Sequence, residues 1–182
     1  MSKRALILID IQNDYFADGK WPLAGMHTAA ANAARVLAAA RAAGDKVIHV
    51  RHEFEAEDAP FFAPGSDGAR THASVLPQAD EAVVLKHQVN AFLGTDLKAQ
   101  LDAAAIEQVT LVGAMSHMCI AAAARASADF GYVTTVVHDA CATHDQTFDG
   151  ITVDAAQVHA ANMAALAFAY AQVVSTEQYL AG

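Results

Sequence analysis

The sequence predicts an α/β protein whose mainly parallel sheet is covered by helices on both faces. Short runs rich in Val, Ile and Leu are apolar at consecutive positions, which is typical of strands buried on both faces. Alanine-rich segments with helical spacing separate most of these runs. Strands that alternate with helices favour right-handed crossovers and a parallel sheet. We therefore expect a three-layer α/β/α sandwich, Rossmann-like, with six strands in a single domain over residues 1–182.

The individual elements follow from this pattern in chain order. The expected strands cover residues 4–9, 46–50, 82–85, 108–112, 132–137 and, with a weaker pattern, 172–174. The expected helices cover residues 28–43, 96–105, 117–130 and 154–170. Gly44 and Gly131 stand where a helix end favours a left-handed residue, and Ser116 is placed to cap the third helix. Asp154 with Gln157 resembles a capping box at the start of the fourth. The connection over residues 52–80 is long enough to be a functional lid or binding loop.

Composition excludes several classes of function. A chain of 182 residues with 54% hydrophobic and 17% charged residues is neither disordered nor of low complexity. Its net charge of -9 argues against DNA or RNA as a partner. The apolar runs at residues 5–9 and 163–171 are too short to span a membrane, so no membrane partner is expected. Two cysteines cannot build a disulfide framework, which favours a cytoplasmic location.

Three residues with chemical potential follow three different predicted strands. Asp10 follows the first strand, Lys86 the third, and Cys119 lies shortly after the fourth. Because ligands of open α/β sheets bind beyond the carboxyl ends of the strands, these side chains are expected to converge. If Ser116 caps the helix, Cys119 lies in its first turn, where the dipole and Lys86 favour a thiolate and Asp10 could act as general base. The alternative is a buried structural cysteine beside a strand-end ion pair.

These residues lie within motifs that resemble one known family. The stretches LILIDIQNDYF, KHQVNAFLGTDL and VGAMSHMCIAAAARASADFGYVTTVVHDA are together similar to the isochorismatase-like cysteine hydrolases, which include nicotinamidases, N-carbamoylsarcosine amidohydrolases and streptothricin hydrolases. The resemblance implies a catalytic triad of Asp10, Lys86 and Cys119. It also implies an oxyanion hole from the backbone N–H groups of Met115 and Cys119, a cis peptide bond between Ala114 and Met115, and a homodimer or larger homo-oligomer.

The resemblance implies hydrolysis of a C–N bond of a small molecule through a Cys119 thioester, without a cofactor. Nicotinamidases carry an Asp-x-His metal motif after the second strand, whereas this chain has Arg51-His52-Glu53 there. The nine histidines match no tight ligand spacing, so no metal site is expected. The candidate substrate-binding residues are Gln12, Tyr15, Phe16, Trp21, His52, Phe92 and His117. Cys141, in the expected loop after the fifth strand, and His159, within the last long helix, are interpreted as structural.

Three other functions stay open at this point. Isochorismatases proper hydrolyse a vinyl ether and commonly lack the cysteine, so that activity would tolerate the loss of Cys119. A non-catalytic oligomeric scaffold would have an ordinary, slow thiol at Cys119. A redox sensor would require reversible oxidation of Cys119, with Cys141 as a possible partner.

Overall fold

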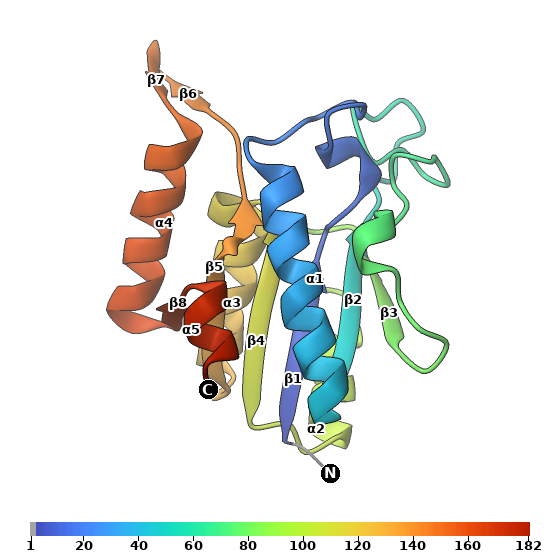
Figure 1. Cartoon of the computed structure of the whole chain (residues 1–182). Coiled ribbons are helices and arrows are strands. Elements are labelled where there is room, and N and C mark those ends of the chain that lie inside the picture. Colours follow the sequence, from blue (N-terminus) through green and yellow to red (C-terminus); the bar gives the residue numbers. More distant parts are fainter. Residues whose placement is uncertain (1–2) are drawn as a thin grey trace.

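The computed structural model describes residues 3–182 and contains a six-stranded sheet in the order β3-β2-β1-β4-β5-β8 (Figure 1). Its strands are β1 (Arg4–Ile9), β2 (Lys46–His52), β3 (Ala82–Lys86), β4 (Gln108–Ala114), β5 (Val133–Ala142) and β8 (Gln172–Val174). Every neighbouring pair is parallel. All six predicted strands are therefore present, and the predicted fold class is confirmed.

Helices cover both faces of this sheet (Figure 1). They are α1 (Met26–Ala43), α2 (Leu97–Ala103), α3 (Ala121–Asp129), α4 (Ala155–Ala169) and α5 (Thr176–Leu180). Alternate residues of β1 enter two separate cores: Leu6 and Leu8 pack with α1, while Ile7 and Ile9 pack with α2 and α3. This alternation follows from the two-residue period of a strand. The result is the three-layer arrangement that the sequence predicts.

The strand order places a binding crevice beside β1. The chain builds β1, β2 and β3 toward one edge, then returns to add β4, β5 and β8 on the other side of β1. Strand order therefore reverses between β1 and β4, and parallel sheets bind ligands beyond the strand ends at such a point. Strands β2 and β3 run beyond their predicted ends, so that His52 and Lys86 are paired across them at the strand termini.

Local signals at the helix ends are mostly confirmed. Gly44 ends α1 with a φ of 70°, and Gly131 follows α3 with a φ of 90°. The side chain of Asp154 caps α4 by accepting a hydrogen bond from the Gln157 N–H. Within residues 3–182, no helix combines the length and the apolar character needed to cross a bilayer.

Several short elements were not predicted. A hairpin of β6 (Gln146–Phe148) and β7 (Ile151–Val153) projects from the body, and the five-residue α5 ends the chain (Figure 1). Short 3₁₀ turns occupy Asn13–Tyr15 and Ala73–Val75. Segments of three to five residues complete too little of a strand or helix period to be recognised from hydrophobic spacing.

Candidate active site

Asp10 lies immediately beyond β1, where the backbone bends sharply. Its φ is 52°, a left-handed conformation uncommon for a residue other than glycine, and its N–H donates to the carbonyl of Val50. The preceding residue, Ile9, is paired on β4 with Gly113, which has a φ of 126°. A Cβ at Gly113 would lie 1.9 Å from the carbonyl oxygen of Ile9. Glycine therefore allows β4 to approach β1 where the Asp10 carboxyl group is fully buried.

Lys86 connects the predicted catalytic residues. It is the last residue of β3, and its side chain is fully buried. Its Nζ lies 2.8 Å from Oδ2 of Asp10 and 3.3 Å from Sγ of Cys119. A third contact of 3.0 Å joins Nζ to Nδ1 of His52. An ammonium group has three N–H donors, and here each has one partner.

Cys119 belongs to a π-helical turn over Ser116–Ile120, which precedes α3. The N–H of Ile120 donates to the carbonyl of Met115, the five-residue spacing of a π-turn. The prediction that Ser116 caps this helix is wrong. Its hydroxyl is buried and instead contacts the carbonyl of Ala142 and Nδ1 of His159, because β5 and α4 pack closely around this turn. The peptide bond between Ala114 and Met115 is cis, as the family resemblance implies.

Burial in the folded structure opposes the thiolate that the helix position favours. Burial, together with the negative charge of Asp10, raises the pKa of the Cys119 thiol to about 12, and the opposing effect of Lys86 is smaller. Burial likewise raises the pKa of Asp10, against the influence of Lys86. Burial lowers the pKa of Lys86, but the charge of Asp10 and the hydrogen bonds to Asp10 and Cys119 outweigh this effect and leave the pKa raised. Burial and the charge of Asp10 therefore favour a neutral Cys119 thiol next to the Asp10–Lys86 ion pair. A neutral thiol must transfer its proton to a general base before it can act as a nucleophile.

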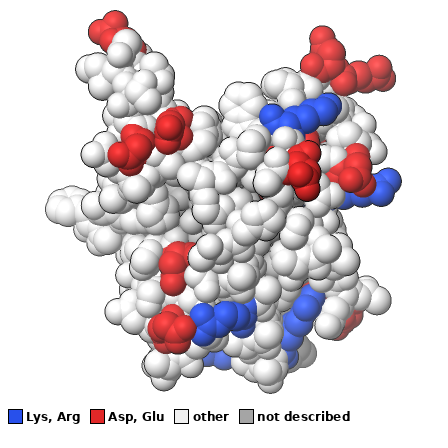
Figure 2. All heavy atoms as spheres, turned by 45° about the horizontal axis from the view of Figure 1, so that its top comes forward, with Lys and Arg blue, Asp and Glu red and all other residues white. Residues whose placement is uncertain are grey.

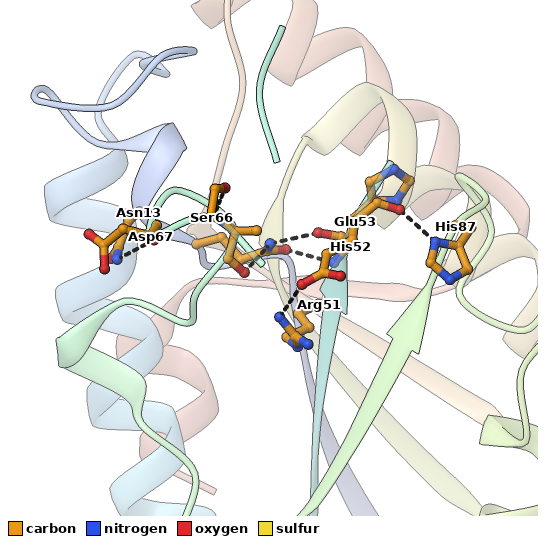
Figure 3. A network of polar contacts seen from close by, with 9 residues as sticks. Asn13, Arg51, His52, Glu53, Ser66, Asp67 and His87 are labelled. Atoms are coloured by element: carbon orange, nitrogen blue, oxygen red, sulfur yellow. Dashed lines mark hydrogen bonds and ion pairs between the residues drawn. The ribbon is translucent and has the colours of Figure 1, made fainter. Parts of the chain in front are cut away.

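His52 is held firmly at the end of β2. The side-chain amide of Gln12 accepts from the His52 N–H at 2.7 Å and donates to the His52 carbonyl at 2.8 Å. It also donates to the carbonyl of Ala69, within the long connection. Figure 3 shows the surrounding network, in which Arg51 pairs with Glu53 and the His87 ring contacts the Glu53 carbonyl. Burial and the nearby Lys86 lower the pKa of His52 to about 4, so the imidazole is neutral.

A cavity of about 330 Å³ opens above these residues. Asp10 and Cys119 form its floor together with Met115, and its other lining residues are Tyr15, His52, Phe54, Phe61, His87, Gln88, Val89 and Met118. This volume lies within the range of about 300–1,000 Å³ that is usual for small-molecule sites. Hollows of about 390, 420 and 450 Å³ occur elsewhere on the described surface, but Asp10, Lys86 and Cys119 line none of them.

The structure brings only two of the seven candidate substrate-binding residues to the cavity wall, Tyr15 and His52. The other five lie elsewhere. Gln12 holds the backbone of His52, Phe16 stacks on His72, Trp21 stacks on Phe61 behind the wall, Phe92 packs against Phe130, and His117 contacts the Thr143 hydroxyl. These five residues pack around the site rather than lining it.

Sequence reasoning missed several lining residues. Phe54 and Phe61 come from the long connection that was predicted to be a binding loop, so its length was the available signal. Residues 87–89 follow β3 directly, and Met118 precedes the nucleophile candidate. Their proximity to the predicted strand ends was a usable signal, but no hydrophobic period distinguishes a residue facing a cavity from one facing a core.

Cys141 and His159 lie outside this cavity. Cys141 was predicted in a loop, but it lies within β5, because this strand continues to Ala142. It is buried, and its thiol donates to the carbonyl of Val137. His159 contacts Ser116, as described above. Within residues 3–182, no three His, Cys, Asp or Glu side chains are arranged to hold a metal ion.

Comparisons with known proteins place the chain in a family. The isochorismatase domain model matches residues 4–178. The chain belongs to the isochorismatase family of hydrolases. The isochorismatase family protein YddQ of Bacillus subtilis is 45% identical over 176 residues, covering 97% of this chain and 98% of that protein. A maleamate amidohydrolase of Pseudomonas putida is 32% identical over 155 residues, covering 75% of this chain and 71% of that protein.

Solved structures agree with this assignment. The crystal structure of a putative isochorismatase hydrolase from Oleispira antarctica has a TM-score of 0.95 and 58% sequence identity, covering 98% of this chain and 96% of that one. The family predicted from the three sequence motifs is therefore confirmed, and the α/β architecture is that of its structural neighbours.

Proposed function

We propose that this isochorismatase-family enzyme hydrolyses a C–N bond of a small molecule through a thioester on Cys119. The observation that carries the proposal is the Lys86 ammonium group, which contacts both the Asp10 carboxylate and the Cys119 thiol at the floor of one cavity. The relative named maleamate amidohydrolase supports C–N rather than ether hydrolysis.

The triad residues have distinct roles in the two half-reactions. Asp10 takes the thiol proton as Sγ attacks the carbonyl carbon, and the N–H groups of Met115 and Cys119 stabilise the oxyanion that forms. One such donor typically contributes about 3–4 kcal/mol. Protonated Asp10 then donates to the leaving nitrogen as the C–N bond breaks and the thioester forms. In the second half, Asp10 takes a proton from water as the water oxygen attacks the thioester carbonyl. Protonated Asp10 then returns that proton to Sγ as the C–S bond breaks, which releases the acid and restores the thiol. Lys86 keeps the carboxylate oriented and stabilises its charge.

The decisive test is Cys119→Ala, measured on a panel of small amides, lactams and ureido compounds. Loss of a catalytic nucleophile typically lowers kcat by about 10⁴-fold or more. We expect that loss with an unchanged circular dichroism spectrum and melting temperature. Cys141→Ala is the matched control and should retain turnover, because Cys141 lies outside the cavity. Activity near wild type in Cys119→Ala on this panel would contradict a Cys119 thioester, whereas turnover of a vinyl ether alone, retained in Cys119→Ala, would support ether hydrolysis.

We also propose that the enzyme is a cytoplasmic homo-oligomer, assembled through the outer face of α4. Its inner residues Val158, Met163 and Leu166 are buried against the body, whereas Phe168 is 91% exposed in an alanine-rich surface. Exposed apolar faces of this kind are commonly covered by a partner. Phe168→Asp should lower the mass measured by sedimentation equilibrium, while Gln157→Asp, an exposed polar position on the same helix, should leave it unchanged. A wild-type monomer would contradict this assembly.

A further inference from the structure

We infer that the cavity selects uncharged amides and rejects those that carry a carboxylate. This inference rests on the proposed C–N hydrolysis and names the substrate class of the same site. Among residues 3–182, no arginine or lysine side chain lines the cavity. A carboxylate bound there would have to leave water without a cationic partner, which is strongly unfavourable.

The lysine beneath the cavity is not available to such an anion. Lys86 is fully buried, and its ammonium group is already shared among Asp10, Cys119 and His52. A substrate carboxylate would therefore compete with Asp10 for this ammonium group and meet its like charge, since Asp10 lines the cavity. Arg51, on β2, pairs with Glu53 at 2.6 Å and does not line the cavity.

Two polar groups of the wall, Tyr15 and His52, are uncharged. Burial, with the charge of Asp10, raises the pKa of Tyr15 well above its ordinary value, so its phenol stays protonated. The Tyr15 hydroxyl makes no hydrogen bond to any other described residue, and it can donate to a neutral acceptor. His52 is neutral because its Nδ1 accepts from Lys86. Neutral donors match a carbonyl, hydroxyl or ring nitrogen of an uncharged substrate.

Aromatic side chains form the rest of the wall. Phe54 and Phe61 meet edge to face with ring centroids 5.1 Å apart, and Phe61 lies 5.9 Å from Tyr15. Phe54 also packs against the His52 ring at 4.6 Å. Rings from the strand end, the 3₁₀ turn and the long connection thus form an apolar part of the cavity wall. This wall favours an apolar or aromatic group beside the scissile carbonyl.

The charge around the cavity acts in the same direction. Figure 2 turns the carboxyl ends of the strands forward and shows acidic side chains on the two raised sides, accompanied by Lys or Arg on the right, with mainly uncharged atoms between the two sides. The whole chain has a net charge of -9. A negative field of this kind lowers the local concentration of anions and slows their entry.

Iodoacetamide and iodoacetate test the inference, because they share one electrophile and differ mainly in charge. Each is attacked by the thiol sulfur with release of iodide and the thiol proton. Rates at Cys119 are measured at pH 8 by peptide mass spectrometry in the full-length protein, and the iodoacetate-to-iodoacetamide rate ratio is compared with that of a small neutral thiol. We expect the ratio at Cys119 to be lower by about tenfold or more.

Val89→Arg and Val89→Gln form the matched pair of variants. Val89 lines the cavity and is 39% exposed, so a long side chain can be accommodated. Val89→Arg should raise the ratio by about tenfold, whereas Val89→Gln, which adds length without charge, should leave it near wild type. A change in the reactivity of the Cys119 thiol alters both alkylation rates equally and cancels in their ratio. A displaced Cys119 side chain therefore cannot produce the expected change in the ratio.

Three outcomes would overturn the inference: a wild-type ratio equal to that of the small thiol, an unchanged ratio in Val89→Arg, or failure of iodoacetamide to label Cys119. The underlying proposed function is tested separately by Asp10→Asn. Suppose that iodoacetamide labels Cys119 in Asp10→Asn as fast as in wild type, and that the iodoacetate-to-iodoacetamide ratio stays low. The cavity would then be selective for uncharged molecules, but Asp10 would not be the base.

Discussion

Lys86 donates a hydrogen bond across 3.0 Å to Nδ1 of His52, the residue paired with it on the neighbouring strand. The contact explains why a buried ammonium group is stable here, since it supplies the third acceptor after Asp10 and Cys119. It also assigns the ring proton of His52 to Nε2, because Nδ1 is the acceptor. His52 is thereby a positioning residue for the triad as well as a part of the cavity wall.

Replacing His52 should weaken catalysis according to whether an acceptor is retained. A hydrogen bond to a charged group typically contributes about 1.5–3 kcal/mol, so His52→Leu should lower kcat/KM by about 10- to 100-fold. His52→Asn keeps an oxygen near the Nδ1 position and should lose less. Steady-state kinetics on the substrate found in the amide screen measures both. An equal loss of kcat/KM in the two variants would indicate that His52 contributes to catalysis through the shape of its ring and not as a hydrogen-bond acceptor.

The pH dependence of Cys119 alkylation should follow Asp10 rather than an ordinary thiol. Because the Cys119 pKa is raised to about 12, thiolate formation alone predicts negligible labelling at neutral pH. With Asp10 as base, the rate should be substantial at pH 7, nearly flat above it, and lost as pH falls through the raised Asp10 pKa. Peptide mass spectrometry after iodoacetamide treatment gives the profile.

Asp10→Asn should abolish the flat part of the pH profile above pH 7. The rate of Cys119 alkylation in this variant should instead increase with hydroxide concentration. Cys141, whose pKa burial raises to about 12 and which has no neighbouring base of this kind, serves as the internal control. A wild-type Cys119 profile centred near the ordinary thiol pKa of about 8.5 would contradict general-base activation.

Gly113→Ala should destabilise the sheet at the active-site edge. The added Cβ would lie 1.9 Å from the Ile9 carbonyl oxygen, and the φ of 126° is unfavourable for alanine. We expect a loss of more than about 3 kcal/mol in the free energy of unfolding, measured by urea denaturation. Gly94→Ala is the control, because Gly94 has a φ of 71° but open space around its Cβ position. Its cost should be only about 1 kcal/mol.

Stability in acid should depend on Glu81, which lies far from the cavity. Hydrogen bonds from Arg41 lower the Glu81 pKa to about 2, and further bonds from Gln78 and His49 act in the same direction. A carboxyl group with a depressed folded-state pKa stabilises the fold above its unfolded pKa, and that contribution is lost as pH falls from about 4.5 toward 2. The contribution is on the order of 1–3 kcal/mol.

Glu81→Gln tests this assignment by urea denaturation between pH 7 and pH 3. Its free energy of unfolding should be lower than wild type at pH 7, and the difference should shrink toward pH 3. A difference that is constant over this range would show that packing, rather than the charge of Glu81, is responsible.

Much of this enzyme was predictable from its sequence. Six apolar runs predicted the six strands, and the residues that follow them predicted that Asp10, Lys86 and Cys119 share one edge of the sheet. These inferences succeed because strand alternation and parallel connections are local or topological properties. The three sequence motifs also predicted the family correctly.

Only the tertiary structure decided what surrounds the triad. Phe54 and Phe61 line the cavity while Phe16 and Phe92 do not, and nothing in their local sequences distinguishes them. The protonation of Cys119 was also decided there, because a pKa depends on burial and on charges brought close by folding rather than on position in a helix. Sequence determined which chemical groups meet; packing determined their distances, their solvent exposure and therefore their charge.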